Sequence, residues 1–242
     1  MRLDVGGAVE PSADGLLVRL DVSNRGDVPA TRIDVEGELF GHHAEGSLPA
    51  GVRAGASRSL WLHFPLPPSR PGVHAVALHL RYPVDGAAEP ASQRAYLLVA
   101  LGARAESPLR VSAAPASFET KGALRVELES ADGSTHQARV RVLAPRGVNV
   151  LEQAEVSVPA QGTAVARVPL IRTGPSRRER HDLIVLAEST TDGVASTAVA
   201  RATAELFPHV PVLPRLRVPL AVLGALLLAA AVAAELWRRW KV

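Results

Sequence analysis

Two stretches of sequence that repeat each other decide the fold. Residues 74–86 read HAVALHLRYPVDG, and residues 181–193 read HDLIVLAESTTDG, at an offset of 107. Both begin with His, alternate through apolar positions and end in Asp-Gly. Alternation with a period of two is typical of a strand with one buried face, and Asp-Gly is a common turn pair. We therefore interpret these stretches as equivalent strands in two copies of one fold.

Two further pairs of segments extend the repeat. GLLVRLDV at 15–22 parallels GALRVELE at 122–129, again at an offset of 107. The segment at 47–66 parallels the segment at 157–170, with a six-residue difference in length. The same order of similar segments in both halves predicts tandem domains.

The boundary between the copies falls near Leu101–Ser107, where Gly, a charge pair and Pro interrupt the strand pattern. We assign one domain to residues 1–103 and a second to residues 104–207. Short alternating strands and frequent turns in domains of about 100 residues are typical of immunoglobulin-like β-sandwiches. The predicted fold class is therefore all-β, with two such sandwiches in tandem.

The alternation also predicts which side chains enter each core. Inward-facing residues should be apolar and should alternate with polar neighbours along each strand. In this set we place Leu16, Val18, Leu20, Val22, Ile33, Val35, Leu39, Leu60, Leu62, Phe64, Val76, Leu78, Leu80, Tyr82, Leu124, Val126, Leu128, Val140 and Val142.

The charge of the chain is concentrated at its C-terminal end. The pI is about 9.9 and the net charge is +3, but the residues from Arg215 onward carry five cations and one carboxylate. The remainder therefore sums to −1, which argues against nucleic acid as a partner. Only two of the 27 basic residues are lysine, a composition that suggests a GC-rich bacterial genome. The absence of cysteine excludes disulfides and thiolate chemistry.

An apolar run near the C-terminus predicts a membrane anchor. Residues 218–234 read VPLAVLGALLLAAAVAA, an uninterrupted stretch without a charge. As a helix this run spans roughly 25 Å, and its apolar flanks extend it toward a hydrocarbon core of about 30 Å. We predict a transmembrane helix over 218–237, a Pro-rich linker over 208–217 before it, and a basic cytoplasmic tail over 238–242.

The residues beside the anchor predict its orientation. Three cations follow the apolar run and two precede it, so the positive-inside bias favours a cytoplasmic C-terminus with the domains on the other side. Tryptophans at the same end suit a membrane interface. The predicted interface residues are Trp237, Arg238, Arg239, Trp240 and Lys241.

Alanine recurs at every fourth position within the apolar run. Such a stripe of small residues lets helices pack closely in lipid, although alanine richness alone explains it equally well. The possible helix-packing stripe comprises Ala221, Ala225, Ala229 and Ala233.

The N-terminal residues bear on whether the domains could be exported across the membrane. MRLDVGGAVEPSADG contains no apolar stretch of the kind found in a signal peptide. We expect either a signal upstream of this sequence or a tail-anchored protein with its domains in the cytoplasm.

One segment of the first domain resembles a known family. VSNRGDVPATRIDVEGEL at 22–39 is similar to the strand–turn–strand signature of bacterial CARDB-type and related immunoglobulin-like envelope domains. PGVHAVALHLRYPVDG at 71–86 resembles the strand pair that ends such domains. The resemblance covers most of residues 10–101 and, more faintly, 107–206. It implies a spacer, adhesion or assembly module without catalytic residues.

Several short motifs have a simpler interpretation than the function they suggest. His42 and His43 lack a third ligand at metal-site spacing, so we interpret them as a polar loop. Arg25-Gly26-Asp27 spells an adhesive tripeptide but falls within a turn, where Gly supplies positive φ. His63 and His79 are predicted to point outward, and could pair only if their strands were neighbours. We predict no metal site.

A basic loop surrounds Arg177 and Arg178, with Arg172 and Arg180 close by. Such a loop could contact an anionic headgroup, a phosphate or nucleic acid. We favour a solvated hairpin tip, because Glu179 interrupts the run and no aromatic residue is expected beside it.

The sequence contains no motif for catalysis. Gly-x-Ser-x-Gly, a phosphate loop and His-Glu-x-x-His are all absent. We therefore predict no enzyme and no cofactor, with membrane lipid and envelope proteins as partners. The leading hypothesis is a membrane-anchored envelope spacer, docking or assembly module on a bacterial cytoplasmic membrane. A tail-anchored cytoplasmic adaptor is the alternative, and a carbohydrate-active or metal-dependent enzyme is the third class.

Overall fold

The protein is all-β up to Leu206, as predicted. The structure is a computed structural model, and it describes residues 3–65, 71–83, 90–102, 107–208, 227, 230, 231 and 233. The chain forms two compact units, Met1–Phe207 and Pro208–Val242. The first unit contains two separate hydrophobic clusters, one built from residues Leu3 to Leu101 and the other from residues Leu109 to Leu206. The clusters lie on either side of the predicted boundary, while the exact domain limits remain a prediction.

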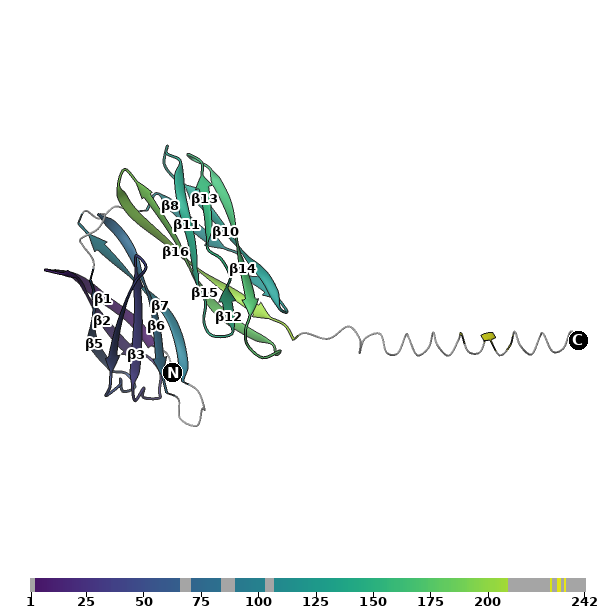
Figure 1. Ribbon diagram of the computed structural model, residues 1–242, viewed down its shortest axis with the longest axis horizontal. Coiled ribbons are helices and arrows are strands. Elements are labelled where there is room, and N and C mark those ends of the chain that lie inside the picture. The colour runs from purple at the N-terminus through teal and green to yellow at the C-terminus, as the bar shows by residue number, and fades with distance from the viewer. Residues whose placement is uncertain are drawn as a thin grey trace, which may run out of the picture. The chain divides into compact units, whose positions relative to one another are not determined.

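The first cluster lies between two sheets of the first sandwich (Figure 1). One sheet has the order β1-β2-β5 and the other has the order β4-β3-β6-β7. Seven strands divided in this way form an immunoglobulin-like sandwich, with the fourth strand on the second sheet. The strands are β1 (Leu3–Ser12), β2 (Gly15–Asn24), β3 (Ile33–Leu39), β4 (His42–Leu48), β5 (Ser57–Phe64), β6 (Gly72–Tyr82) and β7 (Ala91–Leu101).

The second sandwich repeats this plan with additional short strands (Figure 1). Its sheets have the orders β8-β10-β14-β12 and β13-β11-β15-β16, and β9 pairs in parallel with the end of β16. The strands are β8 (Leu109–Ala113), β9 (Ala116–Phe118), β10 (Lys121–Ser130), β11 (His136–Leu143), β12 (Val148–Val150), β13 (Ala154–Val158), β14 (Thr163–Arg172), β15 (Glu179–Thr191) and β16 (Val194–Leu206).

The segments that repeat in the sequence occupy equivalent places in the two sandwiches. β2 and β10 are the central strands of their sheets, β5 and β14 pair with them, and β6 and β15 are central in the opposite sheets. Asp192 and Gly193, which join β15 to β16, both have positive φ, as a tight hairpin turn between twisted strands requires. The two sandwiches therefore repeat one strand order, although equivalent residues of β2 and β10 lie 106 rather than 107 positions apart, because buried Val18 corresponds to buried Leu124.

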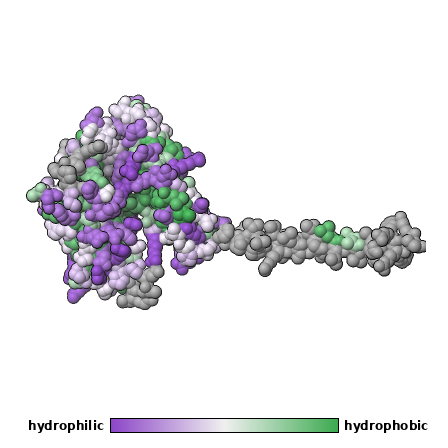
Figure 2. Space-filling view, in the orientation of Figure 1, coloured by the Kyte–Doolittle hydropathy of each residue, from purple (hydrophilic) through white to green (hydrophobic). Residues whose placement is uncertain are grey.

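The predicted core residues are buried in both sandwiches. Each of the apolar residues assigned to the inward faces is at most 8% exposed. The polar faces are turned outward, and most of the surface visible in Figure 2 is hydrophilic. The alternation was therefore sufficient to assign the strand faces.

The edge strands were not predicted from the sequence. β1 and β4 each pair with a single strand, so only one of their sides is constrained, and they carry small or polar residues such as Gly6, Gly7 and His43. The interpretation of His42 and His43 as a loop was wrong, because both belong to β4 and lie opposite Leu39 and Glu38.

The C-terminal unit contains five described residues, Pro208 and four residues further along the chain. Leu227, Ala230, Ala231 and Ala233 are helical, and each is exposed. Among the residues that the structure describes, no helix has the length and apolar character needed to span a bilayer. The predicted linker, helix and tail lie largely outside the described residues.

Candidate functional site

The two sandwiches meet through their main chains at the start of β6 and of β16. The amide of Ala195 donates a 2.8 Å hydrogen bond to the carbonyl of Pro71, and Ala195 forms a parallel bridge with Gly72. A Cβ atom at Gly72 would overlap the carbonyl of Ala195, and the φ of Gly72 is +133°. The hydroxyl of Thr197 donates a 3.0 Å bond to the carbonyl of Val73. Glycine at position 72 is thus what allows the close approach.

Buried side chains outside both cores mark the same contact. Leu186 is fully buried, yet its neighbours Val185 and Ala187 enter the second core, so Leu186 lies on the opposite face of the sheet. Ala75 and Ala77 of β6 are likewise at most 8% exposed, although they alternate with residues of the first core. Small side chains on β6 therefore face outward without contact with bulk water.

An ion pair connects the sandwiches beside these apolar residues. The side chain of Arg141 is 11% exposed, and its Nη2 lies 3.0 Å from Oε1 of Glu38 in the first sandwich. Its Nη1 lies 3.5 Å from Oε1 of Glu188 on the adjacent strand. Burial raises the pKa of Glu188, although the charge of Arg141 opposes this rise. The guanidinium of Arg141 thus pairs with two carboxylates. We call the contacts around Gly72, Ala195 and the Glu38–Arg141 pair the inter-sandwich joint.

Two clefts flank the inter-sandwich joint. Their volumes are about 730 and 660 Å³, and each is lined by residues of both sandwiches. Glu38 and Arg141 line both clefts, so the ion pair stands between them. The contact between the sandwiches is consequently narrow, with polar openings on each side.

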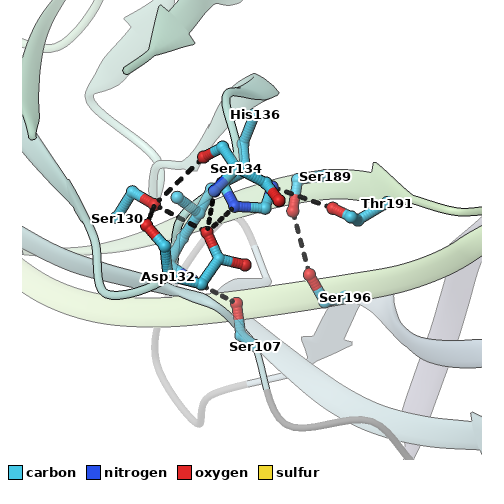
Figure 3. Close-up of polar contacts among 9 residues, drawn as sticks. Ser107, Ser130, Asp132, Ser134, His136, Ser189, Thr191 and Ser196 are labelled. Carbon is cyan, nitrogen blue, oxygen red and sulfur yellow. Dashed lines mark hydrogen bonds and ion pairs between the residues drawn. The ribbon is translucent and has the colours of Figure 1, made fainter. Parts of the chain in front are cut away.

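A polar cluster holds the loop between β10 and β11 in the second sandwich (Figure 3). Oδ1 of Asp132 lies 2.7 Å from Nε2 of His136, and it accepts 3.0 Å bonds from the Ser130 hydroxyl and the Ser134 amide. Nδ1 of His136 lies 2.8 Å from the hydroxyl of Thr191. The hydrogen bond from His136 is the main reason why the pKa of Asp132 is lowered.

The order carboxylate, imidazole and hydroxyl in this cluster is that of a catalytic triad. The imidazole of His136, however, has no exposed surface, and it joins the loop residue Asp132 to Thr191 at the end of β15. A general base must reach a proton on the substrate, which this closed position does not permit. The geometry therefore fits a structural role for the cluster.

Asn24 holds the equivalent loop of the first sandwich. It is fully buried, and its Nδ2 donates to the carbonyls of Val28 at 2.8 Å and Val52 at 3.2 Å. Its Oδ1 accepts the amide of Gly26 at 3.0 Å. The tripeptide that begins at Arg25 is therefore part of a side-chain-held turn, but the expected positive φ at Gly26 is not found.

Arg172 organises the end of the second sandwich from which the chain leaves. Its Nη1 donates to the carbonyl of Phe207 at 2.7 Å and to that of Glu119 at 3.4 Å. Its Nη2 donates to the carbonyls of Pro175 and Arg177. One side chain thus connects the β9–β10 turn, the β14–β15 loop and the last residue of the unit.

The basic loop differs in one respect from its prediction. The guanidinium of Arg178 lies 5.5 Å from the ring centre of Phe207, so an aromatic residue does lie beside the loop. Arg177 pairs with Glu179, and this pairing is the main reason why the pKa of Glu179 is lowered. Most of the loop is exposed, as a hairpin tip would be.

The other histidines that the sequence singled out lie apart. His63 of β5 is 3.2 Å from Asp14, and His79 of β6 is 3.4 Å from Glu36. β5 and β6 belong to different sheets, so the two histidines do not pair. Among the described residues, no group of three or more candidate ligands is arranged to hold a metal ion.

The predicted membrane residues are almost all outside the described part of the chain. Of the interface set and the alanine stripe, only Ala233 is described, and it is helical and exposed. These assignments stay predictions.

Sequence reasoning missed the residues of the inter-sandwich joint. Arg141 alternates with Val140 and Val142, and this pattern predicts an outward charge in water rather than one that a second domain covers. Gly72 lies two residues before the repeated segment at 74–86, where a glycine suggests only a turn. The one signal in the sequence for the contact at Arg141 was its position between two β-branched core residues, Val140 and Val142.

Comparisons with known proteins identify no family for this chain. No protein-family model matches the chain, and no curated protein matches its sequence, so the resemblance to CARDB-type domains stays a prediction. Among solved structures, the native α-2-macroglobulin of E. coli shares 9% identity over 86% of this chain and 17% of its own, with a TM-score of 0.35. A protein of unknown function from Porphyromonas gingivalis W83 shares 14% identity over 85% of this chain and 99% of its own, with a TM-score of 0.33. The D0–D1 domain of intimin shares 14% identity over 84% of this chain and 97% of its own, with a TM-score of 0.31. Likeness at this level carries no information on function.

Proposed function

We propose that the chain is a non-enzymatic, membrane-anchored envelope protein whose paired sandwiches serve as a spacer and docking module. The observation that supports this most directly is the inter-sandwich joint. Main-chain bonds at Ala195 and the Glu38–Arg141 pair connect the two sandwiches, which favours one joined body over two tethered ones. A stiff body of this kind holds a binding surface at a set distance from its point of attachment.

The attachment is proposed from the sequence. The apolar run at 218–234 is long enough to approach the thickness of a bilayer core, and the Pro-rich residues 208–217 favour an extended linker. Arg172 fixes Phe207, the last residue before this linker, to two loops of the second sandwich. Tension on the anchor would therefore be transmitted into the sandwich through several hydrogen bonds. Membership of the CARDB-type group is part of the same proposal.

Membrane attachment is tested by fractionation of cells that express the native gene with any upstream start. The full chain should resist extraction with alkaline carbonate, whereas a chain ending at Phe207 should be released. Release of the full chain would contradict the anchor.

The side of the membrane is tested with a single cysteine. Gly133→Cys is suitable because the chain has no cysteine and a Cβ atom at this position meets no other atom within 4 Å. With a permeabilised outer membrane and an intact inner membrane, an impermeant thiol reagent should label this variant. Labelling only after lysis would instead support the tail-anchored cytoplasmic adaptor.

A further inference from the structure

The outer face of the β1-β2-β5 sheet presents an exposed indole. Trp61 on β5 is the one tryptophan among the described residues, and it is 45% exposed. Its neighbours Leu60 and Leu62 fill the first core, so the indole projects from the opposite, solvent-facing side. Aromatic side chains are scarce in this chain, at 4% of residues, and this one does not contribute to a core.

Polar side chains lie on one side of the indole at defined register positions, while Leu17 and His63 form the next pair on its other side. Arg19 lies directly opposite Trp61, and Asp21 lies directly opposite Ser59. Residues that face each other across antiparallel strands project from the same side of the sheet. The Ser59 hydroxyl donates a 2.5 Å bond to Oδ1 of Asp21, and Arg19 Nη2 lies 3.4 Å from Oδ2 of the same carboxylate. The polar groups are thus held in place by one another beside the ring.

The third strand of the sheet, β1, contributes only small side chains beside Arg19 and Asp21. Gly6 lies opposite Asp21, and Ala8 lies opposite Arg19. A Cβ atom added at Gly6 would meet no other atom within 4 Å. The sheet surface on the far side of Arg19 and Asp21 from the indole is therefore low. We call this outer surface the Trp61 face; it comprises Gly6, Ala8, Arg19, Asp21, Ser59 and Trp61.

The second sandwich provides an internal comparison for this surface. In its β10–β14 pair, Arg125 lies opposite Arg167 and Glu127 lies opposite Val165. By their place in the paired strands, these positions correspond to Arg19, Trp61, Asp21 and Ser59. The repeated fold therefore does not itself require an aromatic residue here.

We propose that the Trp61 face binds a neutral polysaccharide through its pyranose rings. The C–H face of a pyranose is weakly positive and apolar, and it complements the electron-rich face of an indole. The hydroxyls at the ring edge both donate and accept, and the Asp21 carboxylate and Arg19 guanidinium offer one partner for each role. Because these two side chains pair with each other, the face carries little net charge, which favours an uncharged glycan.

The chemistry of the face fits a glycan better than a protein partner. A stable protein interface requires about 800 Å² from each partner with a dehydrated apolar centre. The Trp61 face offers one ring beside polar groups. This inference goes beyond the proposed spacer role and does not depend on membrane attachment, since glycan binding can be measured on isolated protein.

The test is calorimetric titration of the purified full chain with cellohexaose, chitohexaose and maltohexaose. The detergent should be a polyoxyethylene ether, so that no glycoside competes for the site. We expect at least one hexasaccharide to bind, and Trp61→Ala to weaken this binding on the order of tenfold, equivalent to about 1.4 kcal/mol. Trp61→Tyr should retain most of the affinity, and Asp21→Ala should weaken it. Arg167→Ala, at the position of the second sandwich that corresponds to Trp61, is the matched control and should have no effect.

Two outcomes would overturn the proposal. One is the absence of binding to all three hexasaccharides. The other is binding that Trp61→Ala leaves unchanged, which would place the glycan elsewhere. Circular dichroism of each variant separates loss of the site from loss of the fold, and Asp21→Ala, which alters a second residue of the Trp61 face, keeps the test decisive if Trp61→Ala unfolds.

Discussion

The loop after β2 in the first sandwich is held by the amide of Asn24, whereas the loop after β10 in the second is held by Asp132 and His136. Both loops cross from one sheet to the other at the same point of the strand order. The fold therefore requires that buried main-chain and side-chain polar groups at this crossing be satisfied, but it does not specify by which residue. A neutral amide and a titratable pair fulfil the same structural need and respond differently to pH.

The largest effect should come from equivalent core positions. Leu20 and Val126 are central in β2 and β10, and both are fully buried. Replacing either with Asp buries an unpaired carboxylate, which costs several kcal/mol and should unfold the sandwich that contains it. Because the hydrophobic clusters are separate, calorimetry should retain the unfolding transition of the other sandwich. Loss of both transitions from either variant would show that the two cores fold as one.

The loop residues provide the next comparison. Asn24→Ala removes three hydrogen bonds in the first sandwich, and His136→Ala removes two in the second. Each variant leaves buried partners unsatisfied, so each should lower the free energy of unfolding of its own sandwich by about 2 kcal/mol at neutral pH. Urea denaturation followed by circular dichroism measures both. If only one of the variants were destabilised, the two loops would not be equivalent.

Acid should distinguish the two loops. The pKa of Asp132 is lowered in the folded protein, so its contribution to stability is complete above the unfolded value of about 4 and is lost as the pH falls through the lower folded value. The side chain that holds the other loop, the amide of Asn24, does not titrate. The melting temperature of the wild type should therefore decrease more steeply below pH 4 than that of Asp132→Asn. If the melting temperatures of the two proteins fell in parallel with pH, Asp132 would not be responsible for the acid sensitivity of its loop.

The smallest effect should be at the inter-sandwich joint. A double-mutant cycle with Glu38→Gln and Arg141→Ala measures the coupling of the pair, which we expect to be about 1 kcal/mol because the guanidinium is mostly buried. The pair Glu188→Gln with Arg141→Ala is the control within one sandwich. A coupling of zero between Glu38 and Arg141 would mean that the ion pair does not connect the sandwiches.

The sequence predicted the central strands well because both of their faces are constrained. One face of β2, β6 or β10 must enter a core and the other must meet solvent, so alternation is visible in the residues. β1 and β4 were missed because an edge strand tolerates Gly6 or His43 without loss of packing. Arg141 was missed for a different reason: its environment is made by a second domain, and a local period carries no information about a contact with a distant part of the chain.

The candidate site was only partly accessible to the same reasoning. The turn that contains Arg25-Gly26-Asp27 was predicted, because glycine and aspartate favour turns, but the buried amide of Asn24 that holds this turn was not. Asp132 and His136 depend on Thr191, which is adjacent only in the folded sandwich. The basic loop was located correctly, but its contact with Phe207 depends on how β16 ends beside it.

The central claim is that the two sandwiches form one stiff body, and a distance measurement between them tests it most directly. Nitroxide labels at Gly6→Cys and Gly133→Cys occupy positions where an added side chain meets no atom within 4 Å, and the full chain has no other cysteine. Pulsed dipolar spectroscopy should give a single narrow distance distribution. Adding Gly72→Val, which cannot keep the contact with Ala195, should broaden it. A broad distribution in the parent protein, or one that Gly72→Val leaves unchanged, would contradict the account.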